Sequence, residues 1–173
     1  MVPPGMAMVS VSPEAWKAQA AAKIPRFYWD FTRAKNYLDD KKENPWTPAV
    51  SIVYAFTVSL KMMLKEGINN IFERHVRIGQ MTRDGIIKMG LPLFAEATHA
   101  SNTVTAVSIP EGLDGKKLRQ TLREEYKVVL AGGQQTLDGK IFRIGHLGMV
   151  SEKDIKEVLT AIQKVLPLAG FKK

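Results

Sequence analysis

The sequence predicts an α/β chain that ends in a small α+β domain, in which helices cover a mainly antiparallel sheet. The main observation is the order of segments after Gly90, where strand-like and helical patterns follow one another as β-β-α-β-β-α. This order is typical of helices packed on a small sheet. The second observation is a length of 173 residues with 45% hydrophobic residues. That combination suits a packed core in one domain or slightly more.

The N-terminal segments alternate between apolar and helix-forming patterns. Residues 6–12 are short, apolar and partly β-branched, which predicts a buried strand. The Ser-Pro-Glu sequence at 12–14 is a helix-start pattern, and we expect a helix over 15–23. Residues 24–31 form an aromatic cluster in an extended connection. The polar residues 32–43 are expected to form a surface helix.

Two long helices are predicted in the middle of the chain. The apolar run 49–64 is too long for a strand and is interrupted by polar residues. It therefore predicts a buried helix of about 17 residues, which Gly67 ends. Residues 68–89 carry an apolar stripe at helical spacing with charges opposite, and Gly90 ends this second helix.

The segments after Gly90 predict four strands and two helices. Ser151 and Asp154 have the spacing of a helix cap, which marks the start of the last helix. The expected strands cover residues 91–97, 103–109, 127–131 and 141–145, and the expected helices cover residues 115–126 and 151–166.

The charge of the chain is spread evenly. The formal net charge is +8, from 25 basic and 17 acidic side chains, which in a clustered form would suit nucleic acid or an anionic membrane. Because the excess is not gathered into one arm or stripe, a solvated basic surface is favoured over a phosphate-binding groove. We therefore expect no nucleic-acid partner and no membrane partner.

The zero cysteine count excludes disulfides, thiolate metal sites and a cysteine nucleophile from this chain. The N-terminus has no signal-peptide pattern, and no apolar run approaches a membrane-spanning length of about 18 residues. We expect a cytoplasmic protein. The three histidines, His75, His99 and His146, match no metal-binding spacing, so no metal site is predicted.

The most informative local feature is the segment 139–148, Gly-Lys-Ile-Phe-Arg-Ile-Gly-His-Leu-Gly. Strand alternation places Phe142 and Ile144 on one face and Arg143 on the other. An arginine with open space beside it can bind a carboxylate through its planar fork. The alternative is an arginine on the solvent face of a sheet, which the residues alone favour.

Three segments resemble class V, fold-type I pyridoxal-phosphate aminotransferases, and most closely the alanine–glyoxylate / serine–pyruvate aminotransferase branch. They are the opening Met-Val-Pro-Pro-Gly-Met-Ala, the Asn-Pro-Trp-Thr-Pro break at 44–48 and the Gly-Lys-x-x-Arg-Ile-Gly-His-x-Gly run at 139–148. The resemblance spans essentially the whole chain. It implies that residues 1–48 are the end of the large cofactor-binding domain, 49–90 long connecting helices, and 91–173 the small C-terminal α+β domain.

The resemblance also implies chemistry. The complete enzyme would move an amino group from alanine or serine to glyoxylate or pyruvate, with pyridoxal 5'-phosphate as cofactor, in a homodimer. Arg143 would bind the carboxylate of the amino-acid and 2-oxo-acid substrates, and Thr47 would reach the cofactor phosphate of the neighbouring subunit. The lysine that forms the Schiff base with the cofactor is expected upstream of Met1, so no catalytic residue is expected in this chain. We expect the chain alone to be inactive and to need a complementary N-terminal half.

Two other functions stay open on the sequence. The first is a non-catalytic small-domain binding module, which the expected absence of the lysine supports. The second is a basic nucleic-acid-binding domain, which the even charge disfavours. The zero cysteine count disfavours the sister branch of cysteine desulfurases. If the chain is part of a larger enzyme, an apolar face should be exposed. Its expected members are Met6, Met8, Val9, Val11, Phe27, Tyr28 and Trp29.

Overall fold

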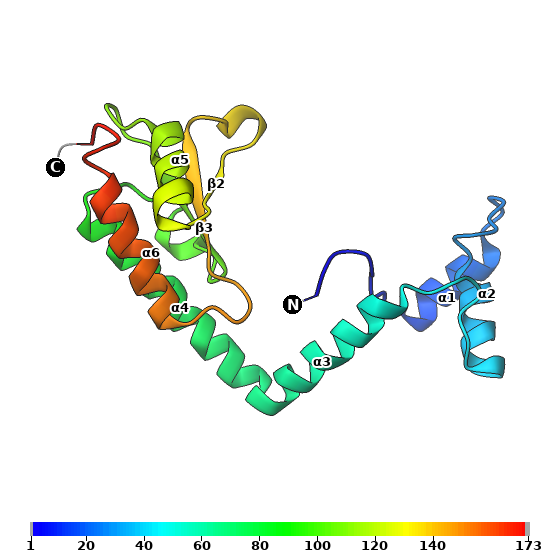
Figure 1. Ribbon diagram of the computed structural model, residues 1–173. Helices are drawn as coiled ribbons and strands as arrows, with labels where there is room; N and C mark the ends of the chain where they lie inside the picture. Colours follow the sequence, from blue (N-terminus) through cyan, green and yellow to red (C-terminus); the bar gives the residue numbers. More distant parts are fainter. Residues whose placement is uncertain (1, 172–173) are drawn as a thin grey trace. The chain divides into compact units, whose positions relative to one another are not determined.

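The computed structural model describes residues 2–171. Met1 of the opening motif and the last two residues of the predicted C-terminal domain therefore lie outside the described residues. The chain divides into two compact units, unit 1 (Met1–Met62) and unit 2 (Met63–Lys173), and Figure 1 labels most of their helices and strands. The division after residues 48 and 90 that the resemblance implies stays a prediction. Within residues 2–171, no helix is long and apolar enough to cross a membrane.

Unit 1 holds short helices with capped starts. α1 (Pro13–Ala21) follows Ser12, whose hydroxyl accepts a hydrogen bond from the Ala15 N–H at 3.1 Å. The predicted helix start is therefore confirmed. α2 (Phe31–Asn36) continues into η1 (Tyr37–Lys41), a π-helical turn. Together they confirm a helical segment after the aromatic cluster.

The strand predicted for residues 6–12 is wrong, because this segment has no regular structure. Strand N–H and C=O groups need a neighbouring strand, and the described part of unit 1 contains none. The predicted exposure of the apolar face is confirmed for all but one residue, since Val11 is half-buried. The exposed members are Met6, Met8, Val9, Phe27, Tyr28 and Trp29.

α3 (Val50–Glu66) confirms the predicted long helix but not its burial. It has 17 residues, of which Ser59 is the buried one. Large apolar side chains are open along it, with Tyr54 72% and Leu64 81% exposed. A helix buries apolar side chains only where another element packs on them, and residues 2–171 leave these side chains uncovered. The prediction failed because the apolar pattern of a helix does not say which chain segment covers it.

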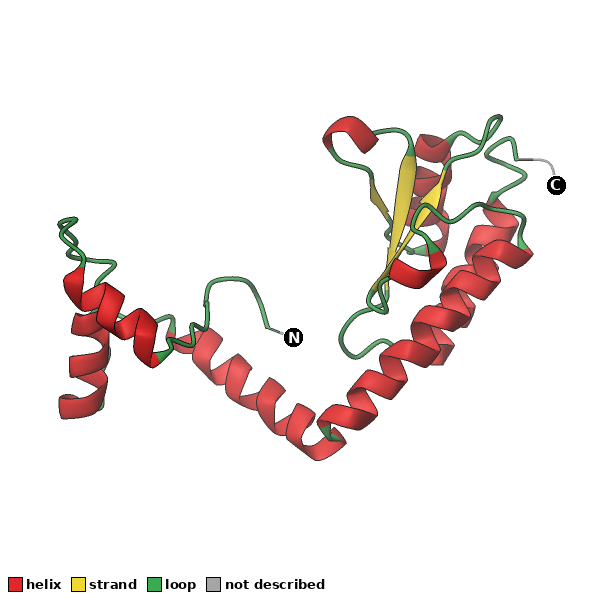
Figure 2. Ribbon diagram, turned by 180° about the vertical axis from the view of Figure 1, so that it is seen from behind, coloured by secondary structure: helices red, strands yellow, loops and turns green. Residues whose placement is uncertain are grey.

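Unit 2 packs helices against an antiparallel sheet of three strands (Figures 1 and 2). The strand order is β1-β3-β2, so β3 is the central strand. The predicted helices over 68–89, 115–126 and 151–166 and the strand 141–145 are confirmed. The elements in chain order are α4 (Ile68–Lys88), η2 (Ala97–His99), β1 (Val104–Ser108), α5 (Gly115–Tyr126), β2 (Ala131–Gly132), η3 (Gln135–Leu137), β3 (Ile141–Gly145) and α6 (Glu152–Val165).

The core of unit 2 lies between one face of the sheet and the helices. Val107 of β1 pairs with Phe142 of β3, and both are fully buried. They belong to one cluster with Leu118 and Leu122 of α5 and Ile162 of α6. Figure 2 shows the helices on one side of the sheet. The predicted small antiparallel sheet covered by helices is therefore confirmed.

Two predicted strands are wrong in extent. Residues 91–97 contribute only an isolated bridge between Leu93 and Val107, because Pro92 has no N–H to donate to a ladder. The strand predicted over 127–131 is confined to β2, because residues 127 and 128 still belong to the C-terminal cap of α5. Lys127 has a φ of 58°, and the next N–H donates to the carbonyl of Leu122 at 3.0 Å.

Candidate functional site

Arg143 lies at the middle of the central strand. Its cross-strand partners are Ala106 in β1 and Ala131 in β2. Phe142 and Ile144 beside it are buried among the helices, so alternation places Arg143 on the opposite face of the sheet, as the sequence predicts. Because both cross-strand neighbours are alanines, the guanidinium has room above the sheet.

One hydrogen bond fixes the plane of this guanidinium. The Nε of Arg143 donates to the carbonyl of Gly132 at 2.9 Å, and the side chain is half-buried. Among residues 2–171, no carboxylate forms an ion pair with Arg143. The two terminal nitrogens, Nη1 and Nη2, therefore remain for another acceptor, and as a pair they match the two oxygens of a carboxylate.

The turn after β2 fixes the carbonyl that holds Arg143. A Cβ on Gly133 would overlap the backbone carbonyl of Leu137, so this position requires glycine. The Gly133 N–H donates to the carbonyl of Ile141 at 3.1 Å, which closes the turn onto β3. Gly132 thus ends β2, Gly133 begins the loop that follows, and together they support the arginine.

His146 continues the buried face of β3. Its Nδ1 lies 3.2 Å from the carbonyl of Asn102, and its Nε2 lies 2.8 Å from the hydroxyl of Thr105. Since a carbonyl can only accept, Nδ1 carries a hydrogen, and in the neutral ring Nε2 then accepts from the Thr105 hydroxyl. Burial lowers the pKa of His146. This histidine is neutral and structural, and no group of three His, Cys, Asp or Glu side chains within the described residues could hold a metal ion.

Thr47 lies in unit 1, so the two predicted site residues belong to different units. Trp46 beside it stacks on Tyr28 with ring centroids 5.2 Å apart, and its indole N–H donates to the Tyr28 carbonyl at 3.3 Å. Thr47 itself is exposed. Trp46 is thus anchored, and the exposed Thr47 hydroxyl follows it shortly before the first residue of α3. A hydroxyl of this kind can donate a hydrogen bond to a phosphate oxygen.

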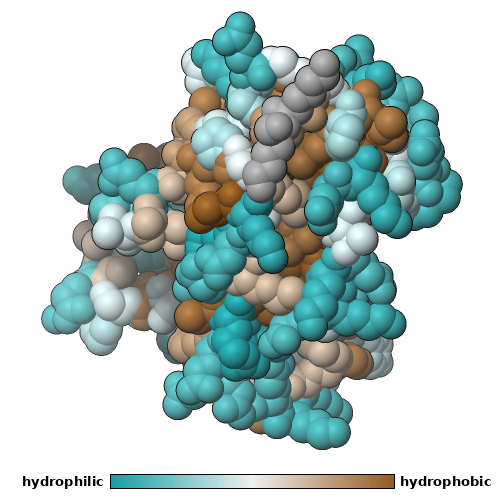
Figure 3. Space-filling view, turned by 90° about the vertical axis from the view of Figure 1, so that its left-hand side faces the viewer, coloured by the Kyte–Doolittle hydropathy of each residue, from teal (hydrophilic) through white to brown (hydrophobic). Residues whose placement is uncertain are grey.

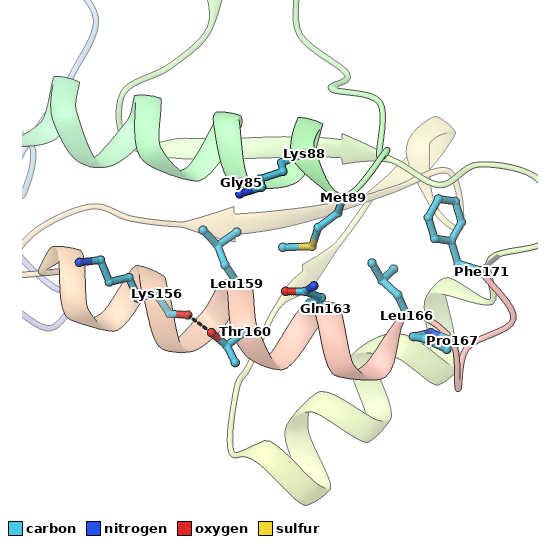
Figure 4. Close-up of a pocket in the computed structure, with 10 residues that line it drawn as sticks. All are labelled: Gly85, Lys88, Met89, Lys156, Leu159, Thr160, Gln163, Leu166, Pro167 and Phe171. Atoms are coloured by element: carbon cyan, nitrogen blue, oxygen red, sulfur yellow. Dashed lines mark hydrogen bonds between the residues drawn. The ribbon is translucent and has the colours of Figure 1, made fainter. Parts of the chain in front are cut away.

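A cavity of about 610 Å³ lies between α4 and α6 and is separate from Arg143. Figure 4 shows that its walls come from these two helices and the C-terminal segment, and none of its residues belongs to β3. Figure 3 shows apolar side chains between hydrophilic ones on this side of unit 2. The lining residues are Gly85, Lys88, Met89, Lys156, Leu159, Thr160, Gln163, Leu166, Pro167 and Phe171.

Two polar residues of α4 that the sequence analysis did not single out lie near the end of β3. Arg74 and His75 of α4 both contact Gly148, in the loop that follows β3. They were missed because the contact joins residues more than seventy positions apart. The only local signal is an adjacent arginine and histidine on the polar side of a helix, which is common on solvated surfaces.

Curated relatives match nearly the whole chain. It is 42% identical over 173 residues to the small subunit of a soluble hydrogenase of Synechococcus sp., covering 99% of this chain and 44% of that protein. It is 42% identical over 171 residues to an uncharacterized aminotransferase of Methanocaldococcus jannaschii, covering 98% and 44%. It is 31% identical over 171 residues to the serine–glyoxylate aminotransferase of Arabidopsis thaliana, covering 98% and 43%. The chain thus spans less than half the length of these relatives.

A solved structure agrees with the sequence relatives. The ureidoglycine–glyoxylate aminotransferase of Bacillus subtilis superimposes with a TM-score of 0.89 at 30% identity, over 97% of this chain and 44% of that one. No protein-family model matches the chain. Apart from the hydrogenase subunit, the similar proteins named above are aminotransferases of the class V, pyridoxal-phosphate type. The resemblance of this chain to the C-terminal part of such enzymes is therefore confirmed.

Proposed function

We propose that the complete protein is a pyridoxal-phosphate-dependent aminotransferase and that this chain supplies its C-terminal part. The observation that carries the proposal is Arg143, whose guanidinium is fixed by Gly132 on the open face of the sheet. The similarity to aminotransferases over nearly the whole chain supports the reaction class. In this proposal residues 1–48 are the end of the large cofactor-binding domain and residues 91–173 form the small C-terminal domain. Residues 49–90 are the long helices that connect the two domains.

The proposed substrates share one chemical group. The amino donor is alanine or serine, and the acceptor is glyoxylate or pyruvate. The similar proteins of Arabidopsis thaliana and Bacillus subtilis both carry glyoxylate in their names. Each of these substrates presents a carboxylate beside the reacting carbon, so one arginine can orient donor and acceptor alike. The fork of Arg143 holds that carboxylate by two hydrogen bonds and thereby sets the direction of the reacting carbon.

Thr47 is the proposed contact to the cofactor phosphate of a neighbouring subunit, through its exposed hydroxyl. Bound pyridoxal 5'-phosphate supplies the electron sink for amino transfer. The residues of this chain bind and orient, while the lysine that bonds to the cofactor is proposed to lie in the N-terminal part. We propose in consequence that the enzyme is a cytoplasmic homodimer and that the chain alone transfers no amino group.

The test is amino transfer by the complete protein, compared with the 173-residue chain alone. The proposal predicts that the complete protein forms glycine from glyoxylate at the expense of alanine or serine and that the chain alone does not. A folded, cofactor-loaded complete protein that consumes none of these donors would contradict it. Salt-dependent binding of DNA or RNA by the chain would favour the nucleic-acid alternative.

A further inference from the structure

The loop that leads out of β3, residues 146–150, begins three positions after Arg143 and runs past α4 to α6 (Figure 1). Its first residue, His146, is fixed to β1 and to the Asn102 carbonyl. Further along, Gly148 has a φ of 79°, a left-handed conformation that glycine adopts without strain. The position of this loop therefore depends on what holds the Gly148 peptide.

Arg74 of α4 holds the carbonyl side of Gly148. Its Nη1 donates to the Gly148 carbonyl at 2.7 Å. Its Nε and Nη2 donate to the two carboxylate oxygens of Glu66 at 2.6 and 3.0 Å, and both side chains are about three-quarters covered. The hydrogen bonds from Arg74 lower the pKa of Glu66. Glu66 thus stays ionised and fixes the guanidinium plane, so that Nη1 points at the loop.

His75, the next residue of α4, holds the amide side of Gly148. Its Nδ1 lies 2.7 Å from the carbonyl of Ile71, and the Gly148 N–H donates to its Nε2 at 3.2 Å. Because the Ile71 carbonyl can only accept, Nδ1 must carry a hydrogen. Nε2 can accept from Gly148 only if it carries none. The observed contacts therefore require the neutral imidazole in its Nδ1–H form.

Protonation of His75 would place a hydrogen on Nε2, facing the N–H of Gly148. Two donors would then oppose each other, and this hydrogen bond would be lost. The charged and titratable groups around His75 are Glu66 of α3, Arg74 beside it, and His146 of the loop. Arg77, half a turn further along α4, pairs with Glu152 of α6 at 3.7 Å.

We propose that Arg74 and His75 form a two-point clamp on Gly148 that positions the loop after β3, and with it the carboxylate-binding Arg143, and that protonation of His75 opens the clamp. Both are positioning residues, since neither contacts the reacting atoms. The link to Arg143 rests on the proposed aminotransferase function, whereas the clamp itself does not.

The first measurement needs no activity. In the 173-residue chain, the hydrogen-exchange protection factor of the Gly148 amide is measured by NMR from about pH 8 to about pH 5, the range in which histidines titrate. Protection should fall about two- to tenfold on acidification, as for the loss of one hydrogen bond. It should be low at every pH in His75→Ala. In His75→Gln, a neutral side chain that can accept from Gly148, protection should persist at low pH.

The second measurement uses the complete enzyme. The KM for glyoxylate should rise about two- to tenfold on acidification in the wild type and stay flat in His75→Gln. His99→Gln, an exposed histidine of the same unit, is the matched control and should behave as the wild type. Unchanged Gly148 protection in His75→Ala, or an equal pH dependence in His75→Gln, would overturn the clamp. If the NMR result holds and the complete protein transfers no amino group, the proposed function fails and the clamp stands.

Discussion

If the complete protein is the proposed aminotransferase, replacement of Arg143 by lysine should weaken its binding of carboxylate substrates, while cofactor binding is retained. The structure shows why charge alone is not enough. The Nε of Arg143 is bonded to the Gly132 carbonyl at 2.9 Å, which leaves Nη1 and Nη2 as a fixed pair on the open face. Lysine keeps the positive charge but has no fork, so the carboxylate is held at one point and can rotate. A hydrogen bond to a charged group contributes about 1.5–3 kcal/mol, or about one to two decades in kcat/KM.

The assay is steady-state kinetics with glyoxylate and with the amino donor. Because both substrates present a carboxylate, kcat/KM should fall by a similar factor for both. The visible absorbance of the bound cofactor should be unchanged. Arg123→Lys replaces an exposed arginine of α5 in the same unit, and it should alter kcat/KM by no more than about twofold. If Arg143→Lys and Arg143→Ala both retain kcat/KM within this range, the carboxylate role of Arg143 is wrong.

Three further outcomes follow from the packing of unit 2. Gly133→Ala should destabilise the chain by about 1–3 kcal/mol in urea unfolding, because its Cβ would overlap a backbone carbonyl, whereas Gly145→Ala, which meets a side chain only at 3.4 Å, should cost much less. Ser151→Ala should lower Tm by roughly 2–4 °C. Hydrogen bonds from Ser151 lower the pKa of Asp154, so this cap is present at neutral pH and is lost as the pH falls through that lowered pKa. The Tm difference should therefore shrink in acid, and a constant difference would argue against the cap. Since burial lowers the pKa of His146 below 6.5, the unfolded chain binds a proton that the folded chain excludes. The free energy of unfolding should fall as the pH drops below 6.5, less steeply in His146→Gln, and an equal slope would contradict this.

Local sequence patterns were enough to predict the features whose interactions join residues only a few positions apart. The capping box of Ser151 and Asp154 starts α6 as predicted. The predicted alternation around Arg143 is observed, because Phe142 and Ile144 both pack into the hydrophobic core on the helix-covered face of the sheet. Both features depend on neighbours in sequence, and a pattern can encode them.

Features that depend on distant partners could not be predicted. The apolar run of α3 indicates a covered helix, but nothing in residues 50–66 says which segment covers it. The bond from Arg143 to Gly132 and the contacts of α4 with Gly148 join residues that only the folded sheet brings together. The sequence therefore predicted the face of the strand on which Arg143 lies, but not the residues that hold its side chain and the following loop.

The carboxylate-binding role of Arg143 is tested most directly by a crystal structure of the complete protein with its cofactor and a 2-oxo acid or an unreactive amino-acid analogue. The distances to measure join the carboxylate oxygens of the ligand to Nη1 and Nη2 of Arg143. We expect two hydrogen bonds of about 2.7–2.9 Å between these atoms, with the Nε–Gly132 bond retained. A ligand carboxylate bound by other residues, with Arg143 turned to solvent, would contradict it.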